Sequence, residues 1–561
     1  MPEISEGAGR LDSWKEIATY LSREVRTVQL WEKNEGLPIH RHQHARQGSV
    51  YAFKSELDAW RTGRKGIPEA PPQDATLRWR AIALLAGSLV VLAAAGFLLW
   101  KYRQTKPSGV SSVVVLPFLD LSAQKDQDYF SDGLTEEIID ALSRVPNLRV
   151  VARTSAFAFK GKNNDIRQIG QQLNVNTVLE GSVRKDGDQL RITAQLNRVS
   201  DGTHLWSRTF DRQLRDIFRV QREISQSIAD QLRAGPVPHR EPTTNLEAYR
   251  FYQEGRYFFN QHLPPDSYNR AIEHYKQAID RDPKFALAYA GLADAYAYLT
   301  ESFIVAPTEV MPKAKEAAEK AVALDDNLGE AHVSRGIVKM DYEWDRDGAQ
   351  REFLRAMQLN PSSGWGHHWY AHSLEAQNRL PEAMQEMRAA LDLDPLSVAI
   401  HWDIGNELLL AHQFDEALRH LQKSLELFPN HPILLYFQAE AYYHKGDISS
   451  AHHVVETLKE TMKGIPEVPT FIAFFGTAAA REGRRAEAEQ VLARLESVRT
   501  KQHVEPIFAM ELCTALHDRR QLLVWAKRAI EGRSTMFVYF PIMKDYYGSD
   551  PEVEALIANA R

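Results

Sequence analysis

The sequence contains a single cysteine, Cys513, among its 561 residues. One thiol cannot form an intramolecular disulfide framework or supply a cysteine-based zinc site, so both classes are excluded. We interpret Cys513 as a small apolar residue buried in a helix. The formal net charge of −6 is mild. The chain as a whole is therefore not a polycation built for nucleic acid, and a nucleic-acid surface would have to be local.

Charge is absent from one long segment, which lies between Arg80 and Lys101 and is almost entirely apolar. At about 1.5 Å per residue, a helix of this length matches the hydrocarbon core of a bilayer. Trp100 and Tyr102 lie at its C-terminal end, where amphipathic rings favour the membrane interface. We predict a single transmembrane helix over 79–101.

Two other interpretations of this segment are weaker. A cleaved signal peptide would stand at the extreme N-terminus, whereas a long polar stretch comes first here. A buried core helix usually carries a polar stripe, and this segment has only Ser88. Basic residues are more numerous before the segment than after it, which favours a cytoplasmic N-terminus. The predicted location is the inner membrane, with a single pass and a periplasmic C-terminal region.

The segment 11–61 has the pattern of a small α+β winged helix-turn-helix. Ser13 and Glu16 form a capping box that begins a short helix. A second helix follows after a tight connection and ends at Gly36. An alternating segment over 40–53 predicts a two-stranded wing, and a last helix follows it. Two short helices at this spacing are typical of helix-turn-helix DNA readers.

The second of these helices is the predicted DNA reader. With Val25, Val28 and Trp31 in the core, its outward side chains would enter the major groove. Arginine and glutamine there can pair with guanine and adenine edges, and nearby basic residues would neutralise phosphates. A small domain that binds protein is the alternative. The predicted DNA-binding residues are Arg23, Arg26, Thr27, Gln29, Lys33, Arg41, His42 and Arg46.

Two groups of histidines invite a metal interpretation. His40, His42 and His44 alternate along the predicted wing, but no fourth ligand is evident. His368 and His372 could share a helix face, but the glutamate of the HExxH zinc-protease pattern is missing. We therefore predict packing or solvated histidines, with no metal and no cofactor.

The N-terminal segment resembles the winged helix of MerR and excisionase-like proteins, through SWKEIATYL, RTVQLWEKNEGLPIHRH and GSVYAFKSELDAW. It especially resembles a version at the N-terminus of large bacterial membrane proteins. The resemblance implies DNA binding. Leu30 departs from it, because an arginine is common at that position. Glu24 also departs from it, because a short helix-capping residue is usual there.

The segment 110–234 predicts an α/β domain. Apolar runs over 110–118 and 148–153 predict strands, and helical segments and two hairpin turns alternate with them. Strand, helix, strand, helix and hairpin together form an α/β sandwich, with helices on one or both faces. The motifs VVLPFLDLS, QDYFSDGLTEEIIDALSRV and VLEGSVRKDGDQLRITAQLNRVSDGTHLWSRTFDR resemble the TolB amino-terminal-like, or FlgO-like, domain. This resemblance implies no catalytic residues and favours a location outside the cytoplasm.

Internal repeats dominate the segment 246–545. Prolines and small residues each recur at a step of 34 residues, with proline ending each second helix. The recurring residues are Pro361, Pro395, Pro429, Ala349, Ala383, Ala417 and Ala451. They resemble the tetratricopeptide repeat consensus, which implies a solenoid whose concave face binds a protein or peptide. Residues 546–561 would cap this solenoid.

Together these parts predict a multidomain fold with one transmembrane α-helix, an α/β domain and an all-α solenoid, joined by linkers at 62–78 and 235–245. We predict a membrane-integrated transcriptional regulator whose cytoplasmic winged helix binds DNA, with a homodimer reading two half-sites. Its TolB-like and repeat regions would bind a periplasmic partner. The alternative is an envelope scaffold whose winged helix docks protein, which Leu30 favours. Nucleophile, base and oxyanion do not come together in the sequence, so we predict no enzyme and no catalytic residue.

Overall fold

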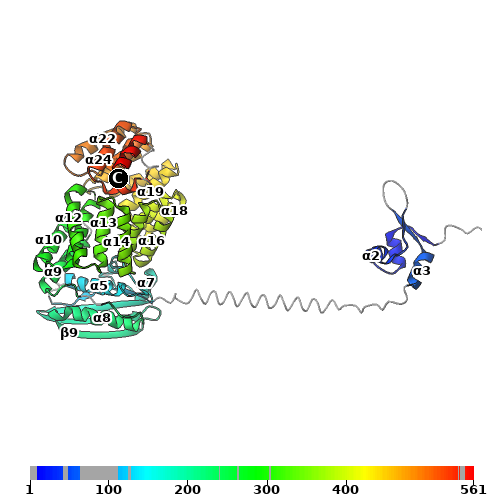
Figure 1. Cartoon of the computed structure of the whole chain (residues 1–561), viewed down its shortest axis with the longest axis horizontal. Helices are drawn as coiled ribbons and strands as arrows, with labels where there is room; N and C mark the ends of the chain where they lie inside the picture. The colour runs from blue at the N-terminus through cyan, green and yellow to red at the C-terminus, as the bar shows by residue number, and fades with distance from the viewer. Residues whose placement is uncertain are drawn as a thin grey trace, which may run out of the picture. The chain divides into compact units, whose positions relative to one another are not determined.

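The computed structural model describes residues 9–41, 49–63, 111–123, 128–238, 241–261, 265–301, 303, 305–540, 542–543 and 550–560. The chain divides into two compact units, Met1–Pro107 and Ser108–Arg561. Figure 1 draws both units, and each is described by itself.

The prediction of a membrane-spanning fold is corrected. None of the helices in the described ranges is long and apolar enough to cross a membrane. The predicted transmembrane helix over 79–101 lies outside the described residues. That prediction depended on hydropathy alone, and the predicted inner-membrane location depended on the same helix, so both are withdrawn. The described chain is instead a mostly helical repeat solenoid with a β region.

The described part of the N-terminal unit contains three short helices and a small antiparallel sheet with the strand order β1–β3–β2. Ser13 caps the first helix as expected, because its hydroxyl accepts a hydrogen bond from the backbone N–H of Glu16 at 3.2 Å. Gly36 ends the second helix with a φ of 66°, which glycine adopts without steric cost. The elements are β1 (Arg10–Leu11), α1 (Trp14–Tyr20), α2 (Val25–Glu35), β2 (His40–Arg41), β3 (Val50–Phe53) and α3 (Lys54–Gly63).

The core of this unit differs from the prediction at one position of α2. Val28 is fully buried, and Trp31 packs on Trp60 with 5.5 Å between ring centroids. Val25, expected in the same core, is 36% exposed. It is the first residue of α2, and the core contacts of the helix begin one turn later, at Val28. The buried face of α2 is therefore shorter than the sequence pattern indicated.

The second unit begins with a mixed six-stranded sheet of the order β6–β4–β7–β8–β9, with β5 paired to β7. Strand β4 runs parallel to β6 and β7, whereas β7, β8 and β9 are antiparallel. Along β8, Leu190, Ile192 and Ala194 are buried and the residues between them are more exposed. This period of two leaves one face of the sheet toward solvent.

The bounds of these elements are β4 (Ser111–Val115), β5 (Leu119–Asp120), α5 (Asp128–Ser143), β6 (Leu148–Val150), α6 (Arg153–Phe157), α7 (Ile166–Gln172), β7 (Thr177–Asp186), β8 (Gln189–Arg198), β9 (His204–Gln213), η1 (Leu214–Asp216) and α8 (Ile217–Gln231).

Pairs of helices fill the rest of the second unit and stack into a solenoid (Figure 1). We call the odd-numbered helices from α9 to α23 the first helices, and their even-numbered partners the second helices. The elements are α9 (Leu246–Phe259), α10 (Pro265–Arg281), α11 (Ala286–Glu301), α12 (Pro307–Leu324), α13 (Gly329–Ile337), η2 (Val338–Tyr342), α14 (Arg346–Leu359), α15 (Gly364–Glu375), α16 (Leu380–Leu393), α17 (Val398–Leu410), α18 (Phe414–Leu427), α19 (Pro432–His444), α20 (Ile448–Thr461), α21 (Pro469–Arg481), α22 (Arg485–Arg499), α23 (Pro506–Ala515), α24 (Arg519–Glu531), η3 (Thr535–Tyr539) and α26 (Pro551–Asn559).

The helix boundaries confirm the 34-residue period. Helices α14, α16 and α18 each end two residues before a proline of the series, Pro361, Pro395 or Pro429. Proline cannot continue a helix, so it fixes the end of each of these second helices. The small residues of the period are fully buried, as close packing of paired helices requires. They are Ala349, Ala383, Ala417 and Ala451.

The buried alanines can be tested by enlarging one of them. We expect Ala383→Leu to destabilise the solenoid by about 1–3 kcal/mol, because added methylenes have no space in a packed helix contact. Gln385→Leu, at an exposed position of the same helix α16, serves as the control. Urea unfolding of both variants measures the difference, and equal stabilities would contradict the packing argument.

Candidate functional site

The candidate nucleic-acid surface is the outward face of α2. Arg26, Gln29, Leu30 and Lys33 are all exposed there, and their spacing of three and four residues places them on one side of the helix. Leu30 is 50% exposed. Thr27 is half-buried and so lies toward the edge of this face. The face therefore presents two cations, one amide and one exposed leucine.

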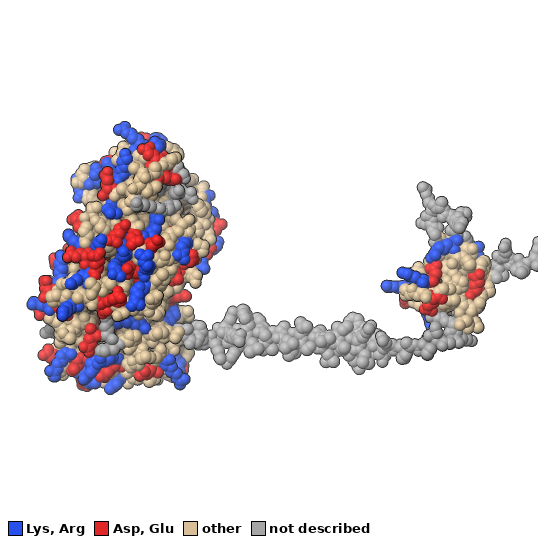
Figure 2. All heavy atoms as spheres, viewed as in Figure 1, with Lys and Arg blue, Asp and Glu red and all other residues tan. Residues whose placement is uncertain are grey.

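The remaining predicted DNA-binding residues lie around α2. Arg23 is exposed before the helix and donates a hydrogen bond to the carbonyl of Ser22 at 3.1 Å. Arg41 on β2 forms an ion pair with Glu32 of α2 at 2.7 Å. His42 and Arg46 lie outside the described residues. On the visible face of this unit in Figure 2, basic and acidic side chains lie side by side. Its surface is therefore not uniformly positive.

Of the three histidines in the predicted wing, only His40 belongs to the described residues. Its Nε2 lies 2.7 Å from Oε2 of Glu56, and its ring stacks on Tyr51 with 5.2 Å between centroids. These contacts give His40 a packing role between β2 and α3.

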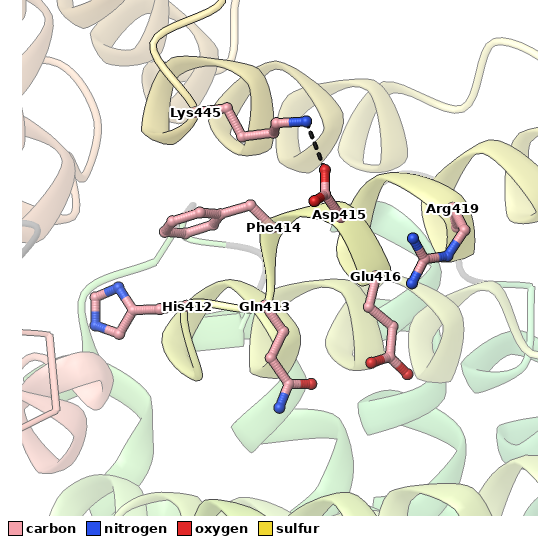
Figure 3. A pocket seen from close by; sticks show the side chains of 7 residues that line it. All are labelled: His412, Gln413, Phe414, Asp415, Glu416, Arg419 and Lys445. Carbon is pink, nitrogen blue, oxygen red and sulfur yellow. Dashed lines mark hydrogen bonds and ion pairs between the residues drawn. The ribbon is translucent and has the colours of Figure 1, made fainter. Parts of the chain in front are cut away.

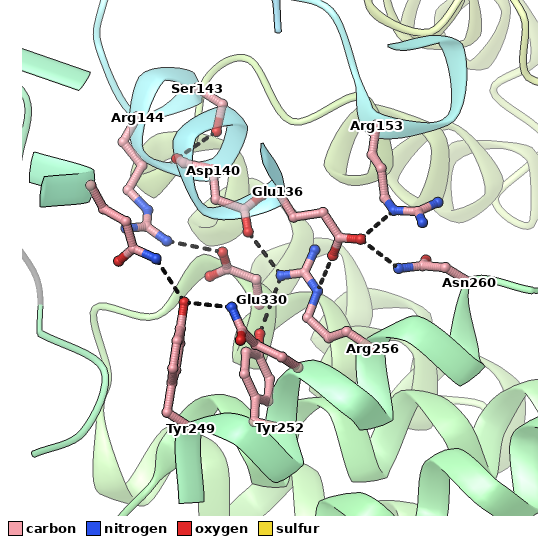
Figure 4. Close-up of polar contacts among 12 residues, drawn as sticks. Glu136, Asp140, Ser143, Arg144, Arg153, Tyr249, Tyr252, Arg256, Asn260 and Glu330 are labelled. Atoms are coloured by element: carbon pink, nitrogen blue, oxygen red, sulfur yellow. Dashed lines mark hydrogen bonds and ion pairs between the residues drawn. The ribbon is translucent and has the colours of Figure 1, made fainter. Parts of the chain in front are cut away.

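A buried ion-pair network joins the α/β part to the first helix pair of the solenoid (Figure 4). The carboxylate of Glu136 on α5 is 3% exposed and accepts from Arg153 at 2.5 Å. Arg256 of α9 reaches the other oxygen of Glu136 at 2.7 Å and also contacts Asp140 at 2.9 Å. One arginine of the solenoid thus holds two carboxylates of α5.

The charges of this network depend on one another. Burial acts to raise the pKa of Glu136, but Arg256 and Arg153 outweigh it and hold that pKa below its ordinary value. Burial, followed by the negative charge of Asp140, raises the pKa of the neighbouring Glu137 to about 7. The two arginines therefore favour the ionised form of Glu136, in a site that raises the pKa of its neighbour.

Further contacts attach β6 and α6 to the loops of the repeats. The backbone N–H of Ala152 donates to the carbonyl of Leu393 at 2.8 Å, and the hydroxyl of Ser155 donates to Asp394 at 2.5 Å. Ser362 donates to the carbonyl of Leu148 at 2.7 Å. The α/β part and the solenoid consequently share one compact unit.

The C-terminal end of the solenoid folds back onto an earlier repeat. The ring of Phe537 in η3 stacks on Trp344 with 4.1 Å between centroids. The guanidinium of Arg346 donates to the carbonyl of Val538 at 2.5 Å, and the indole of Trp344 donates to that of Ser534 at 3.3 Å. These contacts join two parts of the chain that are far apart in sequence, and the repeat pattern gave no sign of them.

A hollow of about 310 Å³ opens at the start of α18 (Figure 3). Lys445 and Asp415 form an ion pair across it at 2.5 Å, and both side chains are exposed. Exposed ion pairs contribute little free energy. The residues that line the hollow do not include the buried, convergent polar groups that are typical of small-molecule sites. They are His412, Gln413, Phe414, Asp415, Glu416, Arg419 and Lys445.

Two protein-family models match the chain. Residues 109–227 match the second domain of HilA/YgeH-like transcriptional regulators. Residues 408–473 match a tetratricopeptide repeat. The repeat prediction is thereby confirmed. The middle region matches a regulator family, and the finer resemblance to a TolB-like domain has no support from this match.

Two curated relatives are similar to part of the chain. The chain is 25% identical over 297 residues to the transcriptional regulator HilA of Salmonella paratyphi A, which is 51% of this chain and 52% of that protein. It is 36% identical over 234 residues to the putative adenylate cyclase 3 of Rhizobium meliloti, which is 40% of each chain. The chain thus spans about half or less of the length of the curated relatives it matches.

The second of these relatives corrects the prediction that the chain belongs to no enzyme class. Part of this sequence is shared with a protein that is named as an enzyme. The prediction depended only on active-site motifs within the chain. Such motifs do not reveal a region that is similar in sequence to part of an enzyme.

Among solved structures, the chain is similar to human IFIT1, with 15% identity, a TM-score of 0.41, and 62% of this chain and 78% of that chain covered. It is also similar to a tetratricopeptide repeat protein of Parabacteroides merdae, with 13% identity and a TM-score of 0.37. That match covers 49% of this chain and 100% of the other. These scores are too low to support a statement about function.

The ion-pair network around Arg256 leads to a prediction about the stability of the second unit. We expect Arg256→Met to destabilise it by about 3 kcal/mol, because the change leaves buried carboxylates without their main cation. Arg250→Met on the same helix is the matched control. The side chain of Arg250 is 48% exposed, so the loss of its ion pair with Glu254 should cost less than about 1 kcal/mol. Guanidinium unfolding measures both, and a similar loss in the two variants would refute the role given to Arg256.

A second prediction concerns Asp294 of α11, which accepts a hydrogen bond from Ser334 of α13 at 2.6 Å. Burial raises the pKa of Asp294 to about 7. A carboxyl group whose pKa is raised in the folded state binds more protons there than in the unfolded state. The free energy of unfolding therefore falls as the pH rises from about 4 to about 7.

We therefore expect Asp294→Asn to stabilise the protein at pH 8 by on the order of 3 kcal/mol, and to have little effect near pH 4. Asp280→Asn, at an exposed position of α10, is the control. Thermal unfolding followed by circular dichroism at both pH values measures the effect. A stabilisation that is the same at both would show that titration is not its cause.

Proposed function

We propose that this chain is a transcriptional regulator whose N-terminal unit binds DNA through α2 and whose repeats bind the protein that controls it. The observation that carries the proposal is the match of residues 109–227 to a domain of HilA/YgeH-like transcriptional regulators. The tetratricopeptide repeats imply a protein partner. A regulator of this kind needs a DNA-binding element, and the exposed face of α2 is the best candidate.

The side chains on that face suit base and phosphate contacts. Arg26 and Gln29 have the bidentate groups that read guanine and adenine edges in the major groove. Lys33 and Arg23 supply cations for phosphates, which fix the register of a reading helix. In a homodimer, two such helices would read half-sites about one helical turn apart.

A second function for the N-terminal unit is docking of another protein. The 50% exposed Leu30 favours this function, because an apolar side chain in the middle of a reading face adds no phosphate contact. The ion pair of Arg41 with Glu32 also reduces the positive charge available beside α2.

Binding of the full-length chain to DNA tests the two functions. Duplexes selected from a random-sequence pool provide the ligand, and fluorescence anisotropy over a range of salt concentrations provides the affinity. We expect Arg26→Ala combined with Lys33→Ala to weaken binding. The change should flatten the slope of log K against log salt by about 0.9 for each phosphate that the variant no longer neutralises.

Lys15→Ala combined with Arg61→Ala removes the same charge from α1 and α3 and is the control. Equal affinities and slopes in the two double variants would refute the role of α2 in DNA binding. Loss of partner binding in Leu30→Ser, without any DNA binding by the wild-type chain, would favour the docking function.

A further inference from the structure

A cluster of histidines and carboxylates lies on four elements of consecutive repeats, α11, η2, α15 and α17. Helix α11 contacts α13, which precedes η2, and α13 contacts α15. Side chains of α15 and α17 meet at His368 and Asp403. The cluster is separate from α2 and from the network around Arg256. Its members are Glu301 of α11, Asp341 of η2, His368, His372 and Glu375 of α15, and Asp403 and Glu407 of α17.

The centre of the cluster is a carboxylate held between two imidazoles. His368 and His372 are four residues apart on α15, and their ring centroids are 4.9 Å apart. Oδ2 of Asp403 lies 2.7 Å from Nε2 of His368 and 3.5 Å from Nε2 of His372. One ligand atom from each of the three residues lies within 4.8 Å of the other two. Facing helices present metal ligands in this manner in helical bundles.

The second nitrogen of His372 is oriented as in metal sites. Its Nδ1 lies 3.0 Å from Oε2 of Glu375. The other carboxylate oxygen of Glu375, Oε1, accepts a hydrogen bond from Asn406 at 3.5 Å. A histidine that binds a metal through one nitrogen usually donates the proton of the other to a carboxylate or carbonyl. Glu375 thus fixes the ring so that Nε2 points toward Asp403.

Glu407 supplies an independent observation. It stands one turn after Asp403 on the same face of α17 and is 1% exposed. Neither of its carboxylate oxygens has a hydrogen-bond partner among the described residues. A buried carboxyl group without a partner is costly, and a cation at this position would satisfy it.

A second group of buried carboxylates in the same solenoid, Glu440 and Glu511, is paired with an arginine. Arg481 of α21 contacts Glu440 of α19 at 2.7 Å and Glu511 of α23 at 2.9 Å. The cluster around Asp403 has more carboxyl groups than imidazoles, and no lysine or arginine of the described ranges pairs with Asp403 or Glu407.

We propose that His368, His372 and Asp403 bind a divalent transition-metal ion, represented in the test by Zn²⁺, with the buried carboxyl group of Glu407 one turn away on α17. Imidazole nitrogen and carboxylate oxygen are ligands that zinc takes at about 2.0–2.2 Å in tetrahedral sites. The side chains of His372 and Asp403 are 17% and 14% exposed, so an ion can enter from that side. The ion would join α15 to α17 beside Tyr539 of η3, whose ring centroid is 6.2 Å from that of His372.

The test measures metal binding by the full-length chain, after treatment with a chelator. Equilibrium dialysis against Zn²⁺ gives the stoichiometry, and absorption of the Co²⁺-loaded chain reports tetrahedral coordination. We expect about one Zn²⁺ per chain, with an affinity that falls by at least about tenfold in His368→Gln combined with His372→Gln. The matched control is His452→Gln combined with His453→Gln, which removes two exposed histidines of α20 and should leave the binding unchanged.

Two outcomes would overturn the proposal. The first is equal Zn²⁺ binding by the wild-type chain and the His368/His372 double variant. The second is a wild-type chain without a tetrahedral Co²⁺ spectrum, and this result does not depend on how any variant folds. Asp403→Asn provides a variant of nearly unchanged shape, and we expect it to lose the Co²⁺ spectrum.

Discussion

Close contact between paired helices is the constraint on which the second unit depends. Each second helix approaches its first helix at an alanine without exposed surface, such as Ala383 or Ala417. A larger side chain there would separate the helices, because protein interiors have no spare volume. The contact recurs every 34 residues from Ala349 to Ala451, so the helix pairs from α14 to α20 are spaced regularly. The solenoid is therefore a regular support on which side chains of distant repeats can converge.

The α/β part is attached to this support by buried charge. Arg256 comes from α9, the first helix of the solenoid, and both carboxylates that it contacts belong to α5. Breaking a buried ion pair leaves an unpaired charge in a low dielectric, so separating the two parts is unfavourable. The hydrogen bonds of Ala152 and Ser155 to the loop after α16 add a second attachment. A protein bound to the repeats would thus act on a body that includes the regulator-like region.

Local features were predictable from the sequence, whereas contacts between distant residues were not. The prolines and alanines of the 34-residue period determine helix ends and helix packing nearby, so the pattern reveals them directly. Asp403 lies 35 positions from His368, and Arg256 lies 116 positions from Asp140. The first pair meets because successive repeats stack, and the second because α5 packs on α9. The same limit explains Val25, whose exposure depends on where the core of the N-terminal unit ends.

Charged groups along the first helices give this solenoid two kinds of interior. Between α19 and α23, Arg481 balances Glu440 and Glu511, so that region is neutralised by the chain itself. Between α11 and α17, carboxylates outnumber imidazoles, and part of the charge must be removed by protons or by a cation. A cation bound by Asp403 and the two imidazoles would also lower the cost of the unpaired carboxyl group of Glu407, one turn along α17. That region also contacts η3, through the rings of His372 and Tyr539.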